Sequence, residues 1–227
     1  MRSRRHLPLL AVVAVVLVVV LAGLVTNNVT DGIDLAIIRV VRASALVAPL
    51  SILRQVTELG STTAMMILAI VLLLSELVAG RPWSGITGAA TIGLASLGNE
   101  LAKGLMARAR PDLIQPIVVE RGYSFPSGHA ALSMVGYGVA ALLVARSGAP
   151  RGVKVAAAFA AGCLVALIGI SRVYLGAHFP TDVLAGWLAG GAVVLIFAWL
   201  SPASKARAGA PAASDPAGPR SDPPGKP

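Results

Sequence analysis

Residues 153–200 read VKVAAAFAAGCLVALIGI-SRVYLGAHFPTD-VLAGWLAGGAVVLIFAWL, two long apolar runs separated by a polar stretch that includes Arg172, His178 and Asp182. Each run is close to the length that an α-helix needs to cross the hydrocarbon core of a bilayer, about 20 residues. A helix satisfies its backbone hydrogen bonds internally, as the bilayer interior requires. This stretch therefore predicts two membrane-spanning helices joined by a short connection that carries ionisable groups.

The whole chain has the composition of a membrane protein. Of its 227 residues, 56% are hydrophobic and 13% are charged, and the mean hydropathy of +0.80 is too apolar for a soluble domain. We predict an all-α, integral-membrane six-helix bundle that occupies residues 1–200 as one domain. The predicted spans are Leu7–Val25, Ser61–Val78, Ile86–Leu105, Ala130–Ala145, Val153–Ile170 and Val183–Leu200.

Two segments fall outside these spans. Residues 26–60 are predicted to form an extracytoplasmic loop. Within it, Leu35–Leu53 is apolar enough for a span, but it holds Arg39, Arg42 and Pro49 near its middle. Because a central arginine costs roughly 2.5–3.5 kcal/mol on insertion scales, we predict a helix that lies in the membrane interface. Residues 201–227 are rich in Pro, Ala, Gly and Ser, and we predict a disordered cytoplasmic tail.

The distribution of basic residues predicts the orientation. With a cytoplasmic N-terminus, 11 of the 19 Lys and Arg residues fall on the cytoplasmic side and 8 on the other side. The positive-inside rule then favours cytoplasmic N- and C-termini in a multi-pass protein of the cell membrane. The net charge of +9 is scattered between apolar segments rather than gathered in one stripe, so we predict no nucleic-acid partner.

With this topology, three polar stretches meet on the extracytoplasmic face, at the ends of the third to sixth spans. Together they carry three basic residues, Lys103, Arg110 and Arg172. Guanidinium groups match the oxygens of a phosphoryl group, and an ammonium group adds positive charge. Free backbone N–H groups at a helix N-terminus add further partial positive charge. Ser127 is a suitable N-cap for the fourth span, and Gly128 allows an anion to approach the backbone. These five residues predict a phosphate-binding site.

Two histidines and a carboxylate add the groups that phosphoryl transfer requires. Pro180 favours the first position of a helix, which puts Asp182 in the first turn of the sixth span and His178 just before it. The carboxylate can then accept one ring N–H and leave the other nitrogen of His178 free as a nucleophile. His129, from another helix, could protonate the departing oxygen.

Three patterns in this region resemble the signatures of the type 2 phosphatidic acid phosphatase superfamily, which includes lipid phosphate phosphatases, prenyl diphosphate phosphatases and vanadium haloperoxidases. They are K-x6-R-P (Lys103, Arg110, Pro111), P-S-G-H (Pro126–His129) and S-R-x5-H-x3-D (Ser171, Arg172, His178, Asp182). The resemblance covers residues 99–187. It implies a six-helix membrane fold, a phosphohistidine intermediate on His178 oriented by Asp182, and His129 as general acid. It also implies phosphate binding by Lys103, Arg110, Ser127, Gly128 and Arg172 without a metal or other cofactor.

We therefore expect a membrane phosphatase that hydrolyses a phosphate monoester or diphosphate at the head of a lipid. Prenyl diphosphate, phosphatidic acid and phosphatidylglycerol phosphate all fit. A lipid-phosphate binding or transport protein is the non-enzymatic alternative, but binding needs only the cations and not the set of His178, Asp182 and His129. A vanadate-dependent haloperoxidase-like site is the other alternative, and it is disfavoured because the enzymes of that type are soluble.

Overall fold

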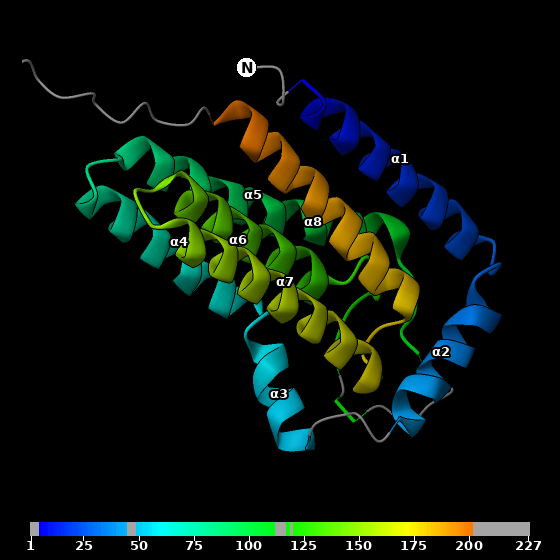
Figure 1. The fold of residues 1–227 in the computed structure, drawn as a ribbon. Coiled ribbons are helices and arrows are strands. Elements are labelled where there is room, and N and C mark those ends of the chain that lie inside the picture. Colours follow the sequence, from blue (N-terminus) through cyan, green and yellow to red (C-terminus); the bar gives the residue numbers. More distant parts are fainter. Residues whose placement is uncertain (1–4, 45–48, 112–116, 119, 202–227) are drawn as a thin grey trace, which may run out of the picture.

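A computed structural model describes residues 5–44, 49–111, 117–118 and 120–201, which form eight α-helices and no strand. In chain order the helices are α1 (Leu7–Thr26), α2 (Asp31–Ala43), α3 (Leu50–Glu58), α4 (Thr62–Val78), α5 (Pro82–Met106), α6 (Gly128–Arg146), α7 (Arg151–Tyr174) and α8 (Pro180–Leu200). Figure 1 shows them as one elongated bundle with α2 and α3 at one end. The predicted all-α fold is confirmed for the described residues.

Each of the six predicted spans corresponds to a long helix, α1 and α4 to α8. Local sequence explains several of their ends. The Ser61 hydroxyl accepts the backbone N–H of Ala64 at 3.2 Å and so caps α4. Pro82 and Pro180 occupy the first turns of α5 and α8, where the missing N–H is not needed. The helix α7 continues to Tyr174, so Arg172 lies in its last turn rather than in a connection.

Four of the described helices, α1, α6, α7 and α8, are long and apolar enough to cross a membrane. The pair α3 and α4 passes the same criteria together, with a bend of 51° between the two helices, and would make a fifth crossing. The chain is therefore a multi-pass membrane protein.

The segment before α4 differs from the prediction. Residues 35–53 were expected to form one interfacial helix, whereas the structure has two helices, α2 and α3. Ser44 ends α2 in an extended conformation, and Pro49 is the N-cap of α3. Proline is compatible with a helix start but not with a helix interior, because it lacks the N–H and its ring clashes with the preceding turn. The predicted disordered tail lies outside the described residues, apart from Ser201.

The centre of the bundle is α6, which packs against α5, α7 and α8. Contact with α8 is close because α8 has no side chains at two facing positions. A Cβ at Gly186 would lie 2.7 Å from the backbone oxygen of Ser127, and one at Gly190 would lie 2.6 Å from that of Ala131. Small residues four apart are a common means of bringing membrane helices together.

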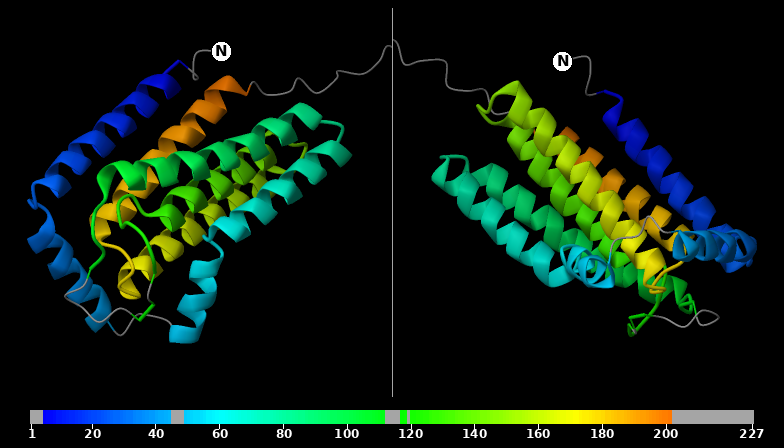
Figure 2. Two further views of the ribbon diagram at one scale, coloured as in Figure 1. Left: turned by 180° about the vertical axis from the view of Figure 1, so that it is seen from behind. Right: turned by 60° about the horizontal axis from the view of Figure 1, so that its bottom comes forward.

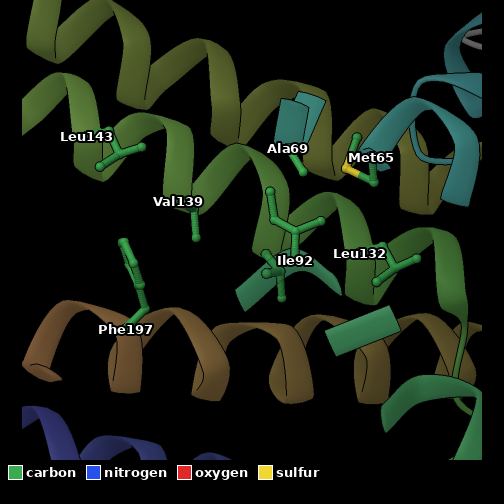
Figure 3. Packing of buried hydrophobic residues seen from close by; sticks show 8 residues of the cluster. Met65, Ala69, Ile92, Leu132, Val139, Leu143 and Phe197 are labelled. Atoms are coloured by element: carbon green, nitrogen blue, oxygen red, sulfur yellow. The ribbon is translucent and has the colours of Figure 1, made fainter. Parts of the chain in front are cut away.

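The largest apolar core lies between α4, α5, α6 and α8 (Figure 3). It consists of Met65, Ala69, Ile92, Leu132, Val135, Val139, Leu143 and Phe197. The helix α1 lies along α8 at one side of the bundle, and α4 and α5 form the opposite side, as both views in Figure 2 show. The helices α2 and α3 pack against α7 at the end of the bundle where α8 begins.

Candidate active site

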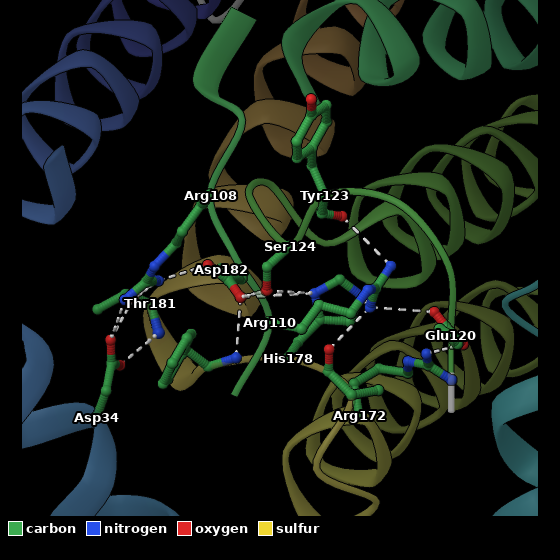
Figure 4. Close-up of polar contacts among 12 residues, drawn as sticks. Asp34, Arg108, Arg110, Glu120, Tyr123, Ser124, Arg172, His178, Thr181 and Asp182 are labelled. Atoms are coloured by element: carbon green, nitrogen blue, oxygen red, sulfur yellow. Dashed lines mark hydrogen bonds and ion pairs between the residues drawn. The ribbon is translucent and has the colours of Figure 1, made fainter. Parts of the chain in front are cut away.

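Three segments that are far apart in the sequence meet at this end of the bundle. They are the residues after α5, the residues that lead into α6, and the connection from α7 to α8. Figure 4 shows their polar side chains in contact, together with Asp34 from α2. The convergence of the predicted polar stretches is thus present in the structure.

The connection between α7 and α8 places His178 beside Asp182. Both side chains are buried, with at most 1% of the residue surface exposed. The Nδ1 atom of His178 lies 3.5 Å from Oδ2 of Asp182 and 3.4 Å from the hydroxyl of Ser124. Asp182 Oδ2 also accepts hydrogen bonds from the Ser124 hydroxyl and from the backbone N–H of Phe179. Asp182 therefore lies in the first turn of α8, as predicted, on the Nδ1 side of the imidazole.

The other ring nitrogen of His178 faces the basic residues. Its Nε2 atom is 3.3 Å from Nη1 of Arg110. Burial lowers the pKa of the His178 imidazole below its ordinary value of 6.5, and the charges of Arg172 and Arg110 lower it further, against the opposing effect of Asp182. The ring is therefore neutral at pH 7, and one of its nitrogens keeps the lone pair that a nucleophile needs.

Arg110 is held by backbone carbonyl groups. Its guanidinium donates to the carbonyl oxygens of Ala177 at 2.8 Å and Gly122 at 3.0 Å, and it also reaches those of Arg121 and Tyr123. Because neutral carbonyls take up these donors, the positive charge of Arg110 stays available to an anion. The side chain is fixed in place beside His178.

Arg172 is 1% exposed and occupies the last turn of α7. Its Nη1 atom donates to the hydroxyl of Thr57, on α3, at 2.9 Å. Among the described residues, its Nε atom has no hydrogen-bond partner. The helix α3 thus helps to fix the second guanidinium of the site.

Sequence reasoning missed Glu120, which pairs with both of these arginines. One carboxylate oxygen lies 3.2 Å from Nη1 of Arg110, and the other contacts Nη2 of Arg172. Burial alone would raise the pKa of the Glu120 carboxyl, but the Arg172 guanidinium outweighs it and holds that pKa below its ordinary value. Glu120 is therefore ionised at pH 7, with its two oxygens on the two guanidinium groups. It lies in a loop without periodicity, so no sequence pattern marks it.

The start of α6 supplies the remaining predicted phosphate-binding groups. Ser127 is the N-cap of α6, and its backbone N–H donates to the backbone oxygen of Asp182 at 3.0 Å. Within the described part of the chain, its buried hydroxyl has no partner. A Cβ at Gly128 would lie 3.4 Å from Nζ of Lys103, so the glycine lets this ammonium approach the helix start. Lys103 also pairs with Glu100 at 2.9 Å.

His129 is the second residue of α6 and is partly buried. It lies close enough to His178, Arg172, Lys103 and Glu120 for electrostatic interaction with each of them. The structure thus brings all eight predicted site residues to one end of the bundle. Their roles as nucleophile, general acid and phosphate ligands stay predictions.

Two further residues join the site from unexpected places. Arg108 precedes Arg110 by two positions and donates to Asp182 at 2.6 Å, and Asp34 of α2 accepts from Arg108 at 3.0 Å. The K-x6-R-P pattern includes Arg110 and leaves Arg108 at an unspecified position. The sequence therefore predicted only Arg110 as a phosphate ligand. Among the described residues, no group of three or more His, Cys, Asp or Glu side chains is arranged to hold a metal ion.

Comparison with known proteins identifies relatives of this chain. The model of the PAP2 superfamily matches residues 66–206. Phosphatidylglycerophosphatase B of Bacillus subtilis is 34% identical over 140 residues, which are 61% of this chain and 68% of that protein. Undecaprenyl-diphosphatase of Sulfolobus acidocaldarius is 35% identical over 111 residues, which are 47% of this chain and 50% of that protein.

Two solved structures resemble this protein. The crystal structure of the transmembrane PAP2 type phosphatidylglycerolphosphate phosphatase from Bacillus subtilis has a TM-score of 0.75 at 29% identity, over 82% of this chain and 93% of that one. The crystal structure of Aquifex aeolicus LpxE has a TM-score of 0.55 at 24% identity, over 72% and 93%, which shows a likeness of fold alone. The family match extends over more than half of the chain and the relatives are phosphatases, so the chain is a membrane-embedded phosphoric ester hydrolase that belongs to the PAP2 superfamily.

Proposed function

We propose that this protein removes the phosphate from the head group of a membrane lipid through a phosphohistidine intermediate on His178. The observation that carries the proposal is the orientation of the imidazole. Its Nδ1 side faces Asp182 and Ser124, and its Nε2 atom faces Arg110, one of the two guanidiniums that Glu120 bridges. A phosphate in the place of the Glu120 carboxylate would present its phosphorus to the neutral Nε2.

The reaction follows in two balanced steps. In the first, the lone pair of His178 Nε2 forms a bond to phosphorus while the bond from phosphorus to the leaving oxygen breaks, and His129 gives a proton to that oxygen. In the second, His129 takes a proton from a water molecule, the water oxygen attacks phosphorus, and the bond from phosphorus to nitrogen breaks. Lys103, Arg110 and Arg172 offset the charge on the equatorial oxygens in both steps.

We propose six membrane spans, α1 and α4 to α8, with the site on the extracytoplasmic side. The 17 residues of α4 and the 25 residues of α5 give lengths of about 26 and 38 Å at about 1.5 Å per residue, which suit a hydrocarbon core of about 30 Å. Six spans return the chain to its starting side, and the excess of basic residues on that side favours cytoplasmic termini.

A lipid substrate is supported by a cavity that extends along the bundle from residues next to Ser127 and Gly128. It has a volume of about 590 Å³ and lies between α5, α6 and α8. Asn99 and Pro126 line the end near the site, and Thr87 and Leu200 line the other end. Its walls are mainly aliphatic, as a hydrocarbon chain requires. The two curated relatives are named for phosphatidylglycerol phosphate and undecaprenyl diphosphate, and we propose a substrate of this class.

Phosphate release from the purified protein tests the activity. Phosphatidylglycerol phosphate, undecaprenyl diphosphate and phosphatidic acid serve as substrates, and we expect turnover of at least one of them. The variant His178→Ala should have no turnover but should still bind the lipid, and rapid quenching of the wild type should trap acid-labile phosphate on the protein. Substantial turnover by His178→Ala would overturn the mechanism.

Thiol labelling in intact cells tests the orientation. Tyr123 is 46% exposed near the site, and Gly148 is exposed in the connection between α6 and α7. In a Cys163→Ser background, Tyr123→Cys should react with a membrane-impermeant maleimide, and Gly148→Cys should react only after lysis. The opposite pattern would place the site in the cytoplasm.

A further inference from the structure

Arg108 connects α2 with the first turn of α8. Its Nη1 atom donates to Asp182 Oδ1 at 2.6 Å and to the Thr181 hydroxyl at 2.9 Å, and its Nη2 atom donates to Asp34 Oδ2 at 3.0 Å. The guanidinium also lies 4.0 Å from the centre of the Phe179 ring. All of these contacts are visible in Figure 4, apart from the ring contact. Arg108 thus pairs with two fully buried carboxylates, Asp182 and Asp34, whereas Arg110 donates mainly to backbone carbonyl groups.

Asp34 is the residue that holds Arg108 from the other side. It is fully buried, whereas most residues of α2 are exposed or partly buried. Its Oδ1 accepts the backbone N–H of Thr181 at 3.0 Å, and its Oδ2 accepts the Thr181 hydroxyl at 2.7 Å in addition to Arg108. The Thr181 N–H belongs to the first turn of α8, where backbone donors have no partner within the helix. A carboxylate is also favoured at the positive end of the helix dipole.

We propose that Asp34 and Arg108 are positioning residues for the reaction, because they fix the carboxylate of Asp182 and through it the imidazole of His178. This inference rests on the proposed function of His178. Arg108 holds Oδ1 of Asp182, which leaves Oδ2 for Ser124, the backbone of Phe179 and the Nδ1 side of His178. A carboxylate held by one oxygen alone could turn about its terminal bond, and the ring would turn with it.

The two residues act at a distance from the phosphate-binding side of the site. Arg108 contacts Asp182 on the oxygen that faces away from His178, whereas Arg110 and Arg172 lie at Glu120. Their effect should therefore fall on the rate of the chemical step and not on phosphate binding. Asp34 also lies outside residues 66–206, the segment that matches the family model. The contact thus brings α2 into the support of the catalytic residues.

Kinetics of three single variants and one double variant of the whole chain, residues 1–227, test this inference. We expect Asp34→Asn and Arg108→Gln to lower kcat by about 10- to 100-fold, since a displacement of about 1 Å can cost 100-fold, while KM and the inhibition constant of inorganic phosphate stay within about threefold. Arg108→Lys keeps the charge but not the fork of donors, so its kcat should be intermediate. In the double variant Asp34→Asn/Arg108→Gln, the losses should be smaller than the product of the single losses, because the residues act through one contact.

The matched control is Arg42→Gln. Arg42 also joins α2 to the bundle, by a hydrogen bond from Nε to the backbone oxygen of Tyr174 at 3.1 Å, but it does not contact Asp182. If loosening of α2 alone lowered kcat, this variant would lose as much activity as Asp34→Asn. We expect wild-type kcat and KM for Arg42→Gln, and melting temperatures of all variants in detergent show whether each is folded. If Asp34→Asn fails to fold, Arg108→Lys carries the test.

A second measurement does not depend on turnover. His178 is 1% exposed, and its reaction with diethyl pyrocarbonate can be followed by mass spectrometry of the peptide that contains it. We expect the modification rate to rise severalfold in Asp34→Asn and Arg108→Gln and to stay unchanged in Arg42→Gln. Wild-type kcat and wild-type protection of His178 in both variants would overturn the inference and leave the proposed function standing. Absence of lipid phosphate hydrolysis by the wild type would instead refute the proposed function, and the modification rates would still decide the positioning role.

Discussion

Glu120 lies between Arg110 and Arg172, the two arginines proposed to hold the substrate phosphate. A phosphate that binds there must take these partners from the carboxylate or share them with it. We therefore expect Glu120→Gln to bind phosphate-like anions more tightly than the wild type. The substitution keeps the size of the side chain and removes one negative charge, so the arginines keep their surroundings and lose a competitor.

The magnitude follows from the exposure of the three side chains. Glu120 is 25% exposed, and Arg110 and Arg172 are 15% and 1% exposed. An ion pair in contact with solvent contributes about 0.2–1 kcal/mol, and a hydrogen bond to a charged group contributes about 1.5–3 kcal/mol. Glutamine keeps part of the hydrogen bonding, so we expect a gain of about 1–2 kcal/mol, which corresponds to a factor of about 5–30.

Inhibition kinetics measure this gain. Orthovanadate and inorganic phosphate are tested as competitive inhibitors of phosphate release from the preferred lipid. We expect both inhibition constants to fall about 5- to 30-fold in Glu120→Gln. The control is Glu58→Gln, because Glu58 has the same charge and lies at the end of α3, next to Thr57, but is exposed. Its inhibition constants should change by less than about twofold, since water screens an exposed charge.

A different result would refute the reasoning. If the inhibition constants of Glu120→Gln equalled those of the wild type, the Glu120 carboxylate would not occupy the phosphate site. If they rose, Glu120 would be needed to hold Arg110 and Arg172 in place, and competition would not be its effect. A loss of kcat without a change in either constant would point to a role in the chemical step.

Three further predictions concern packing, pH and metal dependence. Gly190→Ala should lower the melting temperature in detergent, because its Cβ would lie 2.6 Å from a backbone oxygen of α6 and overpacking costs about 1–3 kcal/mol. Gly191→Ala should not lower it, because the space around its Cβ is open. On the acid side, kcat/KM should fall only below pH 6.5, because the nucleophile must be neutral and the pKa of His178 is lowered from 6.5; a fall that begins above this pH would contradict the assignment. Activity should survive excess EDTA, because three basic side chains supply the positive charge; a loss that Mg²⁺ restores would contradict their role.

The six long helices could be predicted because the bilayer imposes a length on each apolar run. The prediction was less successful for residues 31–58, where no such length applies. Arg39, Arg42 and Pro49 argued against a span, but they did not show where one amphipathic helix ends and the next begins. Short helices of this kind depend on packing against the bundle more than on their own sequence.

The site was predictable where chemistry restricts the residue types at a fixed spacing. The position of Asp182 in the first turn of α8 followed from Pro180 and is confirmed. By contrast, Asp34 and Thr181 are 147 positions apart, and no local pattern shows that they meet. Arg108 is one of the 8 basic residues that the predicted topology places on the extracytoplasmic side, and only the tertiary structure shows its contact with a buried carboxylate.

The buried charges at this end of the bundle connect the assembly of the site with the docking of α2 and α3. Asp34 and Asp182 are fully buried and Arg172 is 1% exposed. An unpaired buried charge costs several kcal/mol, and each of these groups has its partner on another element: Arg108 for both carboxylates, and Thr57 and Glu120 for Arg172. Departure of α2 would remove Asp34 from Arg108, and departure of α3 would remove the Thr57 hydroxyl from Arg172. Because buried ion pairs add little net stability compared with apolar packing, the benefit of this arrangement is a fixed geometry at His178. Substitutions of Asp34 in α2 or Thr57 in α3 should therefore change the rate of the reaction before they change the packing of the six long helices.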